Sequence, residues 1–374
     1  MENRLKVGIV GCGEATQALH VPSLNSLASL YRITACSDAS EEVMNEVASR
    51  TGAKPIKNPF RLVEDADVDV VLIATPDSYH LDHALAACNA KKKAVLVEKP
   101  LTLNSRMARE IAKTSAESGV PVLAGYPHVY EPAVRKAMDL WGGPQAFRYG
   151  QFRTFIGPNA KYTADDILQT IRPSVPDRWP GMINQLDYVA SSTELLGTDI
   201  DINFIVAHGL LIGLVIHDIP VMRRLLGEPV KVDYARAHLL GPPMGEFSLA
   251  MDIVLDYGMG RALLQSEMQE IKMTDWGFQV RRGDLMVKVK YPTTYAAAAP
   301  SRCTAIYEKD GMTVEEEHGG RYETGFRCEW KHLHDVVTKG AEPLTSAQDA
   351  VKDLELVEDI MRTMVQQSEQ GGAK

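Results

Sequence analysis

The chain is poor in the features that mark disulfide-stabilised, zinc-binding or membrane-spanning proteins. Only five of its 374 residues are cysteines, and they are scattered without a CxxC pair: Cys12, Cys36, Cys88, Cys303 and Cys328. Such a set fits reduced thiols better than a disulfide framework or a zinc site, so we expect no metal. No apolar stretch could span a bilayer, and no apolar run resembling a signal peptide precedes the first strand. We therefore expect a soluble, cytoplasmic protein with no membrane partner.

Positive charge is also in deficit. The chain has 40 Lys and Arg against 49 Asp and Glu, which gives a formal net charge of -9. This balance argues against a broad phosphate-binding surface, so we expect no nucleic-acid partner. The length exceeds the usual size of one hydrophobic core and predicts two domains.

Strand and helix signals alternate through the first third of the chain. Nearly continuous Val, Ile and Leu runs predict strands at 5–10, 31–36, 68–74, 94–97 and 120–124, and helix signals lie at 15–30, 41–51, 80–90 and 105–118. Because such strands are covered on both faces, they favour a parallel sheet. Repeated βα units predict an α/β Rossmann domain over residues 1–126.

The pattern changes after Tyr126. Long strand-like segments at 145–156 and 230–291 are joined by tight turns, which predicts an α+β domain with a large open, mainly antiparallel sheet over residues 127–344. The stretch 158–198 is expected to be an irregular loop with a short helix that roofs the site. A helix over 345–367 is expected to pack back toward the Rossmann domain, followed by a disordered tail to residue 374. A sheet face rich in Val, Leu and Met over 249–289 favours a homo-oligomer, a dimer or tetramer, formed through the sheet.

A glycine-rich turn follows the first strand directly. Gly11-Cys12-Gly13 stands where a strand passes into a helix, so its glycines let backbone amides approach a pyrophosphate. Thr16 replaces the third glycine of the usual motif, which loosens helix and strand packing there. Asp38 ends the next strand at the distance expected for a carboxylate that accepts hydrogen bonds from the adenosine ribose. Since an acid repels a 2'-phosphate, we predict NAD rather than NADP as the cofactor.

Further motifs make the chain resemble the glucose-fructose oxidoreductase, inositol dehydrogenase and MocA family (Gfo/Idh/MocA). They are Gly11-Cys12-Gly13 with His20, Ala74-Thr75-Pro76 with His80, Glu98-Lys99-Pro100-Leu101, Gly125-Tyr126 leading to Tyr130-Glu131-Pro132-Ala133, and His217-Asp218 running into Leu225-Leu226-Gly227-Glu228-Pro229. The resemblance covers nearly the whole chain. It implies an oxidoreductase that uses a pyridine nucleotide and acts on a sugar, glycoside, polyol or related carbonyl compound.

The resemblance also implies which residues contact the cofactor. These residues follow the first, second, third and fourth strands: Gly11, Gly13, Glu14, Ala15, Asp38, Thr75, Pro76, His80, Glu98 and Lys99. Removing hydride from an alcohol needs a base for the hydroxyl proton and a group that holds the oxygen. Lys99 can stabilise the developing negative charge, and His217, in an apolar segment, is the predicted general acid/base.

The chain departs from the family pattern beside that histidine. Many members carry an aspartate four residues earlier, where this chain has Gly213. Gly213 makes room for a bulkier substrate, or another acid such as Asp187 enters from the 158–198 segment; the sequence leaves both open. Asp218 should point to a different side of a helix from His217 and is expected to cap the helix, pair with Arg223 or meet the Rossmann domain.

Five further residues are candidates for substrate binding. His128 and Tyr130 lie just past the Rossmann domain, and Arg153 stands on a sheet strand that could floor the pocket. Arg178-Trp179 presents an aromatic face beside a guanidinium, which suits a sugar ring or a packed hinge. For each of these a structural function is the alternative.

Three hypotheses of function follow. The first is an NAD-dependent oxidoreductase acting on a hydroxyl of a sugar, glycoside or polyol. The second is a reductase of a non-sugar ketone or conjugated substrate that needs no aspartate. The third is a non-catalytic nucleotide-binding sensor. The presence of both Lys99 and His217 argues against this third hypothesis.

Overall fold

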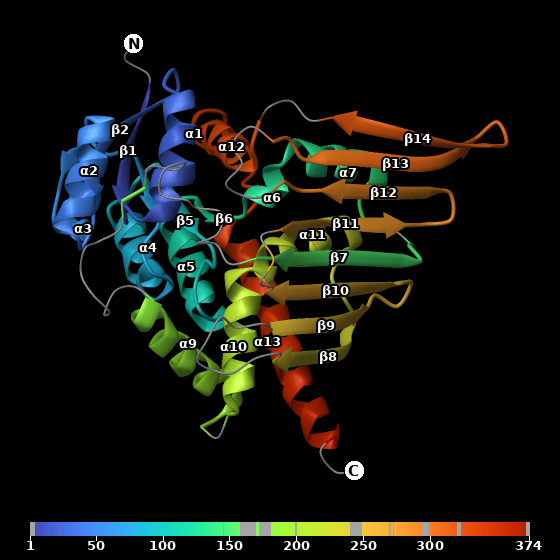
Figure 1. The fold of residues 1–374 in the computed structure, drawn as a ribbon. Helices are drawn as coiled ribbons and strands as arrows, with labels where there is room; N and C mark the ends of the chain where they lie inside the picture. Colours follow the sequence, from blue (N-terminus) through green and yellow to red (C-terminus); the bar gives the residue numbers. More distant parts are fainter. Residues whose placement is uncertain are drawn as a thin grey trace. The chain divides into compact units, whose positions relative to one another are not determined.

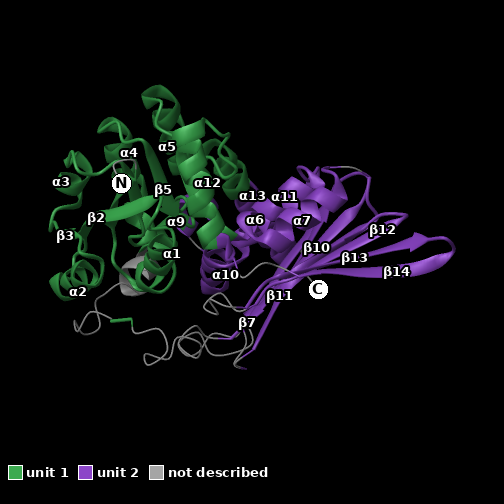
Figure 2. Cartoon of the chain, turned by 90° about the horizontal axis from the view of Figure 1, so that it is seen from above, with its two compact units in different colours: residues 1–127, 164–191, 326–355 green, residues 128–163, 192–325, 356–374 purple. Residues whose placement is uncertain are grey.

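The computed structural model describes residues 4–144, 146–157, 170–171, 181–198, 200–239, 249–268, 271, 273–292, 299–319 and 323–371. Figure 1 shows the elements in chain order. The chain divides into two compact units, which are coloured separately in Figure 2. Unit 1 holds residues 1–127, 164–191 and 326–355, and unit 2 holds residues 128–163, 192–325 and 356–374.

Unit 1 contains the predicted parallel sheet. Its six strands lie in the order β3-β2-β1-β4-β5-β6 and pair in parallel throughout. Their bounds are β1 Leu5–Val10, β2 Tyr31–Ser37, β3 Lys54–Pro55, β4 Val70–Ile73, β5 Ala94–Glu98 and β6 Val122–Gly125. The two-residue strand β3 carries no Val/Ile/Leu run, which is why the sequence pattern missed it.

The helices of the Rossmann fold follow the predicted order with two differences. Their bounds are η1 Thr16–His20, α1 Val21–Ser26, α2 Glu41–Thr51, α3 Pro59–Glu64, η2 Asp77–Tyr79, α4 His80–Asn89 and α5 Ser105–Ser118. The single helix predicted over 15–30 is instead a π-helical turn followed by a short α-helix that ends at Ser26. The short helix α3, which was not predicted, is capped by Asn58, whose side chain accepts from the amides of Phe60 and Arg61.

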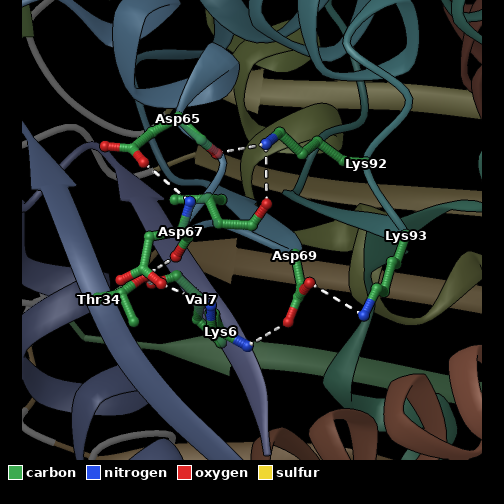
Figure 3. Close-up of polar contacts among 9 residues, drawn as sticks. Lys6, Val7, Thr34, Asp65, Asp67, Asp69, Lys92 and Lys93 are labelled. Atoms are coloured by element: carbon green, nitrogen blue, oxygen red, sulfur yellow. Dashed lines mark hydrogen bonds and ion pairs between the residues drawn. The ribbon is translucent and has the colours of Figure 1, made fainter.

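A lattice of charged side chains ties the strands together at their amino ends (Figure 3). The Lys6 ammonium lies 2.6 Å from Asp67, and the Lys93 ammonium lies 3.0 Å from Asp69. Lys92 is buried and donates to the carbonyl oxygens of Asp65 and Val68. Burial lowers the pKa of Lys92, and nearby carboxylates oppose this shift. The lattice lies at the opposite edge of the sheet from the glycine-rich turn, so its function is structural.

The C-terminal part of the chain contributes to unit 1. The helix α12 (Gly325–Lys339) places Trp330 and Leu333 in the core formed around β1 and β2, and Tyr31 donates its hydroxyl to the Trp330 carbonyl at 2.8 Å. Thr345 accepts a backbone hydrogen bond from Ala124 at 2.7 Å, which fixes the start of α13 (Ala347–Gly371) beside β6. The first turns of α13 therefore belong to the Rossmann unit.

Unit 2 is built on an eight-stranded sheet in the order β14-β13-β12-β11-β7-β10-β9-β8. All neighbours are antiparallel except β7 and β10, which run parallel. The strands are β7 Tyr149–Ile156, β8 Lys231–Leu239, β9 Leu249–Asp256, β10 Arg261–Met268, β11 Thr274–Arg281, β12 Leu285–Lys290, β13 Arg302–Lys309 and β14 Met312–Gly319. The predicted fold class, a Rossmann domain followed by a mainly antiparallel open sheet, is confirmed.

Helices cover one face of this sheet. In the described residues, the helices of unit 2 include α6 Pro127–Tyr130, α7 Pro132–Trp141, α10 Ile202–Gly213, η4 Val215–His217 and α11 Ile219–Leu226, together with the end of α9 and the part of α13 from residue 356. The first residue of α6 belongs to unit 1. The helix α7 packs on β12 and β13, and α10 packs on β8 and β9. In β9 buried and partly exposed residues alternate, so the apolar side chains point toward the helices.

The prediction of an apolar open face over residues 249–289 is therefore wrong. In β9 and β10 the buried apolar residues lie on the covered side: Leu249, Met251, Ile253, Leu255, Ala262 and Leu264. The other side carries a ladder of amide side chains. Gln279 donates to Gln151 at 3.0 Å, Gln151 donates to Gln265 at 3.1 Å, and Gln265 donates to Asp252 at 2.9 Å. Alternate residues of each strand point to opposite faces of the sheet, so a count of apolar residues along the chain does not show which face they occupy.

The segment predicted as an irregular loop contains a longer helix than expected. The helix α9 (Gly181–Leu196) runs for 16 residues, of which those up to 191 belong to unit 1. Tyr188 of this helix donates its hydroxyl to Asp77 at 2.7 Å, and Ser191 donates to the Leu103 carbonyl at 3.1 Å. These bonds fasten the helix to the Rossmann sheet.

Within the part of the chain that the structure describes, no single helix has the length and apolar character needed to cross a membrane. One bent pair, Ile202–His217 with Ile219–Leu226, meets the criteria of length and composition only when its two arms are taken together, with a bend of 55° between them.

The buried side of α13 yields a stability prediction. Leu354 is 1% exposed, so Leu354→Ala should lower the free energy of unfolding by about 2 to 5 kcal/mol through lost apolar contact and a residual cavity. Lys352→Ala, on the exposed side of the same turn, should change it by less than about 0.5 kcal/mol. Urea unfolding measures both; equal effects of the two substitutions would contradict the packing described for this helix.

Candidate functional site

The turn after β1 has no room for a side chain at its first glycine. Gly11 has a φ of +96°, and a Cβ built there would lie 2.3 Å from the carbonyl oxygen of Ala74. Another residue would combine a strained backbone with a clash against backbone atoms. The ends of β1 and β4 therefore meet at Gly11, and only glycine permits this approach.

Gly13, two residues later, faces open space. A Cβ at Gly13 would meet no atom within 4 Å, and the chain then enters the helical turn that begins at Thr16. Such a helix start, with its amides unpaired and its positive dipole end outward, is a site for phosphate groups. Thr16 donates its hydroxyl to the Gly11 carbonyl at 2.6 Å. This bond and the wider π turn accommodate a threonine in place of the third glycine.

A cavity of about 580 Å³ opens at the carboxyl ends of β1, β2 and β4. This volume lies within the range of about 300 to 1,000 Å³ that is typical of small-molecule pockets. The cavity brings together five residues predicted for the cofactor: Gly11, Gly13, Asp38, Thr75 and Pro76. They come from the loops after three strands, at the edge where open α/β sheets bind ligands.

Asp38 lies in the cavity wall and also orders the loops around it. Its two carboxylate oxygens accept from the amides of Cys12 at 2.7 Å and Ser40 at 2.8 Å. Each carboxylate oxygen can accept a second hydrogen bond. Asp38 can therefore hold the glycine-rich turn and accept from a ligand hydroxyl at once.

Three aromatic side chains of the cavity were not predicted. Phe60 and Tyr79 are 44% and 41% exposed, and both lie against the His83 ring, with centroids 5.5 and 6.2 Å away. Burial lowers the pKa of His83 to about 4, so the ring is neutral at physiological pH. Exposed aromatic rings beside a neutral imidazole form a surface on which a flat base can stack. The pairing of Pro59 and Phe60 behind a helix cap was the sequence signal for this surface.

Glu98 of the Glu-Lys-Pro motif is not among the residues that line the cavity, and its contacts are with neighbouring parts of unit 1. Its carboxylate accepts from the His20 ring at 2.7 Å and from the Lys99 amide at 3.0 Å. Trp330 donates its indole N–H to the other nitrogen of His20 at 3.1 Å, which places the proton of a neutral ring on the nitrogen that faces Glu98. Burial alone would raise the pKa of Glu98, but the bond from His20 and the neighbouring charges lower it.

A second acid lies close to this network. Glu329 is fully buried. Burial and the charge of Glu98 raise the pKa of Glu329 well above the usual range, and the backbone amide of Tyr126 partly opposes this rise. The pKa values of these two buried acids are thus shifted in opposite directions.

The remaining predicted residues of unit 1 occupy different places. His80 is buried, and its ring nitrogens lie 2.8 and 2.9 Å from the carbonyl oxygens of Pro100 and Thr75, so it braces the two loops. Glu14 and Ala15 stand at the start of the helix, outside the lining of the cavity. Lys99 is partly exposed at the end of β5, directly after Glu98.

Unit 2 brings His217 and His128 together, with ring centroids 5.2 Å apart. Trp276 lies 5.6 Å from His217 and 4.5 Å from His128, and Tyr291 stacks on His128 at 4.1 Å. Sequence reasoning missed Trp276 and Tyr291, which stand on or just after strands and are 59 or more residues away from both histidines in the chain. Their proximity follows from the strand order.

Asp218 has neither of the contacts within unit 2 that the sequence suggested. Arg223 donates instead to Glu228 at 2.7 and 2.8 Å. Asp218 makes no side-chain cap for α11 and accepts hydrogen bonds from Trp276 and Thr154 of the sheet. Its location immediately before the helix directs the carboxylate toward the strands.

The other predicted substrate residues are dispersed. Arg153 pairs with Asp275 at 3.3 Å on the open face, since its neighbour Thr154 points to the covered face. Tyr130 is buried, and a Cβ at Gly213 would meet nothing within 4 Å. Asp187 lies on α9 in unit 1. Arg178 and Trp179 lie outside the described residues.

Among the residues that are described, no cluster of three or more His, Cys, Asp or Glu could hold a metal ion.

Comparisons with known proteins agree with this geometry. Residues 5–126 match the model of the oxidoreductase family with an NAD-binding Rossmann fold, GFO_IDH_MocA. The chain is 25% identical over 343 residues to inositol 2-dehydrogenase 2 of Saccharopolyspora erythraea, covering 90% of this chain and 85% of the relative.

Two solved structures share the fold. The aldose-aldose oxidoreductase of Caulobacter crescentus has a TM-score of 0.70 at 17% identity and covers 97% of this chain and 98% of its own. The biliverdin reductase of Synechocystis, solved with biliverdin and NADP+, has a TM-score of 0.69 at 18% identity. The match covers 96% of this chain and 99% of the reductase chain.

The two glycines provide a matched test of the cavity. Gly13→Ala should weaken binding of NAD tenfold or more, a loss of about 1.4 kcal/mol or above, because the methyl group projects where the phosphates would lie. Its free energy of unfolding should change by less than about 0.5 kcal/mol. Gly11→Ala should instead destabilise the protein by about 1 to 3 kcal/mol or more through backbone strain. Calorimetric titration and urea unfolding measure these effects; unchanged NAD affinity in Gly13→Ala would contradict the assignment.

Proposed function

We propose that this chain, whose residues 5–126 match the model of an oxidoreductase family with an NAD-binding Rossmann fold, is a member of the Gfo/Idh/MocA family and transfers hydride between a nicotinamide cofactor and a hydroxyl or carbonyl carbon of a sugar, glycoside or polyol. The observation that carries the proposal is the cavity around Gly11, Gly13 and Asp38, which has the form of a dinucleotide site. The substrate class rests on the relative named inositol 2-dehydrogenase 2, which aligns with 90% of the chain.

The cavity fits a dinucleotide in three respects. Gly13 leaves space where a diphosphate would approach the helix start, Asp38 offers free acceptor capacity for ribose hydroxyls, and Phe60 with His83 offers a stacking surface for adenine. Lys57 also lines the cavity, but it is ion-paired with Glu41 and so is not an uncompensated cation for a 2'-phosphate. These features favour NAD over NADP.

Two residues carry the chemistry in this proposal. The bound nicotinamide would supply the hydride acceptor, and the protein must manage the hydroxyl proton and the oxygen. Lys99 is held at the end of β5 by Glu98, whose carboxylate accepts from the Lys99 amide, and its ammonium stabilises the substrate oxygen. His217, partly exposed at the end of η4, accepts the hydroxyl proton.

The absence of an acid at Gly213 supports a second candidate, the reduction of a conjugated or ketone substrate by NADH or NADPH. Such a reaction needs a proton donor and an oxygen-binding group, for which His217 and Lys99 are sufficient. Incubation with NAD and a panel of polyols and sugars that includes myo-inositol, followed by NADH absorbance, decides between the two. Growth of NADH supports the dehydrogenase, and oxidation of added NADH by ketones alone supports the reductase.

We also propose that the open sheet face joins copies of the chain into a homo-oligomer. The glutamine ladder leaves this face polar but well ordered, since every amide group in it has a defined partner. A polar face of this kind suits an interface held by hydrogen bonds rather than by apolar burial.

The cofactor preference is tested at Asp38. Asp38→Ala should narrow the affinity gap between NAD and NADP by about 1 to 3 kcal/mol, because a charge-assisted hydrogen bond to the ribose and the repulsion of a phosphate are both lost. Calorimetric titration of each nucleotide into both proteins gives the gap. Tighter binding of NADP than of NAD to the unmutated protein would refute the assignment.

The catalytic assignment is tested at Lys99 and His217. Lys99→Ala and His217→Ala should each lower kcat by about two to four orders of magnitude, while NAD affinity changes little. The double variant should lose less than the sum of the two effects on the free energy of activation if the residues act as a unit. A His217→Ala enzyme with unaltered kcat on its substrate would rule out the histidine as the base.

A further inference from the structure

Unit 2 contains a buried carboxylate that lacks a cationic partner. Asp218 is fully buried, and both its oxygens lie within hydrogen-bond distance of the Trp276 indole N–H, at 3.0 and 2.9 Å. The Thr154 hydroxyl also donates to it. Among the described residues no Lys or Arg pairs with Asp218. Because a buried charge held by neutral donors alone is costly, a further donor near this carboxylate has an energetic reason to bind it.

The ring of His128 lies beside this carboxylate. Its Nδ1 lies 3.8 Å from Asp218 Oδ1 and, within the described part of the chain, has no hydrogen-bond partner, although the residue is only 8% exposed. The ring stacks on Tyr291 with 13° between the planes and meets Trp276 edge-on at 71°, so both neighbours restrict its rotation. A displacement of about 1 Å closes the hydrogen bond, and catalytic hydrogen bonds often tighten when ligand binds.

The pair stands beside the proposed base. The His217 ring lies 5.2 Å from that of His128, and the same Trp276 that donates to Asp218 lies 5.6 Å from His217. Tyr291 remains neutral because burial raises its pKa well above the usual range, as do the charges of Asp218 and Glu131.

We propose that Asp218 is a positioning residue that acts through His128 and compensates for the acid missing at Gly213. By accepting from Nδ1–H, Asp218 holds the neutral ring of His128 in one tautomer and leaves Nε2 as an acceptor for a substrate hydroxyl. The function of this acceptor rests on the function proposed above, whereas the tautomer itself does not.

The proton balance is simple. Oxidation of the alcohol would move hydride, with the electron pair of the C–H bond, from the alcohol carbon to the nicotinamide, and the hydroxyl proton would pass to the ring of His217, the base proposed above. His128 keeps its own proton on Nδ1, facing Asp218, so neither of these two residues gains or loses a proton in this step.

The tautomer can be measured without activity. In the full chain labelled with 15N-histidine, ring-nitrogen NMR shifts at pH 8.5, assigned with His128→Gln, should show the proton of His128 on Nδ1. Asp218→Asn should move it toward Nε2, because an amide that donates to Nδ1 favours the opposite tautomer. Asp353→Asn, at another fully buried acid, should leave it unchanged. A wild-type ring protonated on Nε2, or on both nitrogens, overturns the proposal even if Asp218→Asn does not fold.

Kinetics then test the positioning function. With NAD and the polyol that gives turnover in the panel, Asp218→Asn and His128→Gln should each lower kcat about 10- to 100-fold, as loss of an orienting partner does. The kcat of the double variant should be no lower than that of the less active single variant, because Asp218 acts through His128. Additive losses overturn the positioning function. If no polyol is oxidised, the function proposed above fails, while the Nδ1 tautomer still supports the Asp218–His128 pair.

Discussion

The contact between Gly11 and the Ala74 carbonyl is the constraint on which the nucleotide cavity depends. In the order β2-β1-β4 the chain leaves β1 toward one side of the sheet and later returns on the other, so β1 and β4 border the point where the connections change direction. A crevice forms there in open α/β sheets. Because a Cβ at Gly11 would come within 2.3 Å of Ala74, the two backbones can meet only at glycine, and the loops after β1 and β4 then share one wall.

Two buried carboxylates, one in each unit, are held by the same chemistry. Glu98 accepts from His20, which in turn accepts from the Trp330 indole, and Asp218 accepts directly from the Trp276 indole with His128 beside it. Tryptophan supplies a donor on a large apolar body, so it satisfies a carboxylate without bringing water into the core. Glu329, whose side-chain oxygens have no hydrogen-bond partner among the described residues, differs: burial and the charge of Glu98 raise its pKa well above the usual range.

The sequence predicted the Rossmann unit well because its signals are local. The predicted strand at 5–10 and the helices at 41–51 and 105–118 coincide with β1, α2 and α5, where apolar runs, helix caps and terminal glycines all agree. Short elements such as β3 and α3 escaped because they carry too few residues to establish a period. The family resemblance is confirmed. The glycine-rich turn and Asp38 line one cavity, and their binding of a cofactor stays a prediction.

Contacts between distant strands could not be predicted in the same way. Trp276 and Thr154 reach Asp218 because β11 and β7 are neighbours, and strand order in an antiparallel sheet is not encoded by spacing along the chain. The same limit led to the wrong assignment of an apolar open face, since that face is decided by which alternate residues the helices cover.

The position of the missing acid shows why such contacts matter for function. A carboxylate at residue 213 would approach His217 from the preceding helical turn, along the chain. Asp218 instead lies behind His128, held by side chains from two strands of the sheet, so its orientation is set by sheet packing and not by helix geometry. The requirement of the proposed chemistry is an oriented imidazole nitrogen, and either arrangement can provide it. A site can therefore lose an acid from its sequence motif and still keep a carboxylate among the residues that order its histidines.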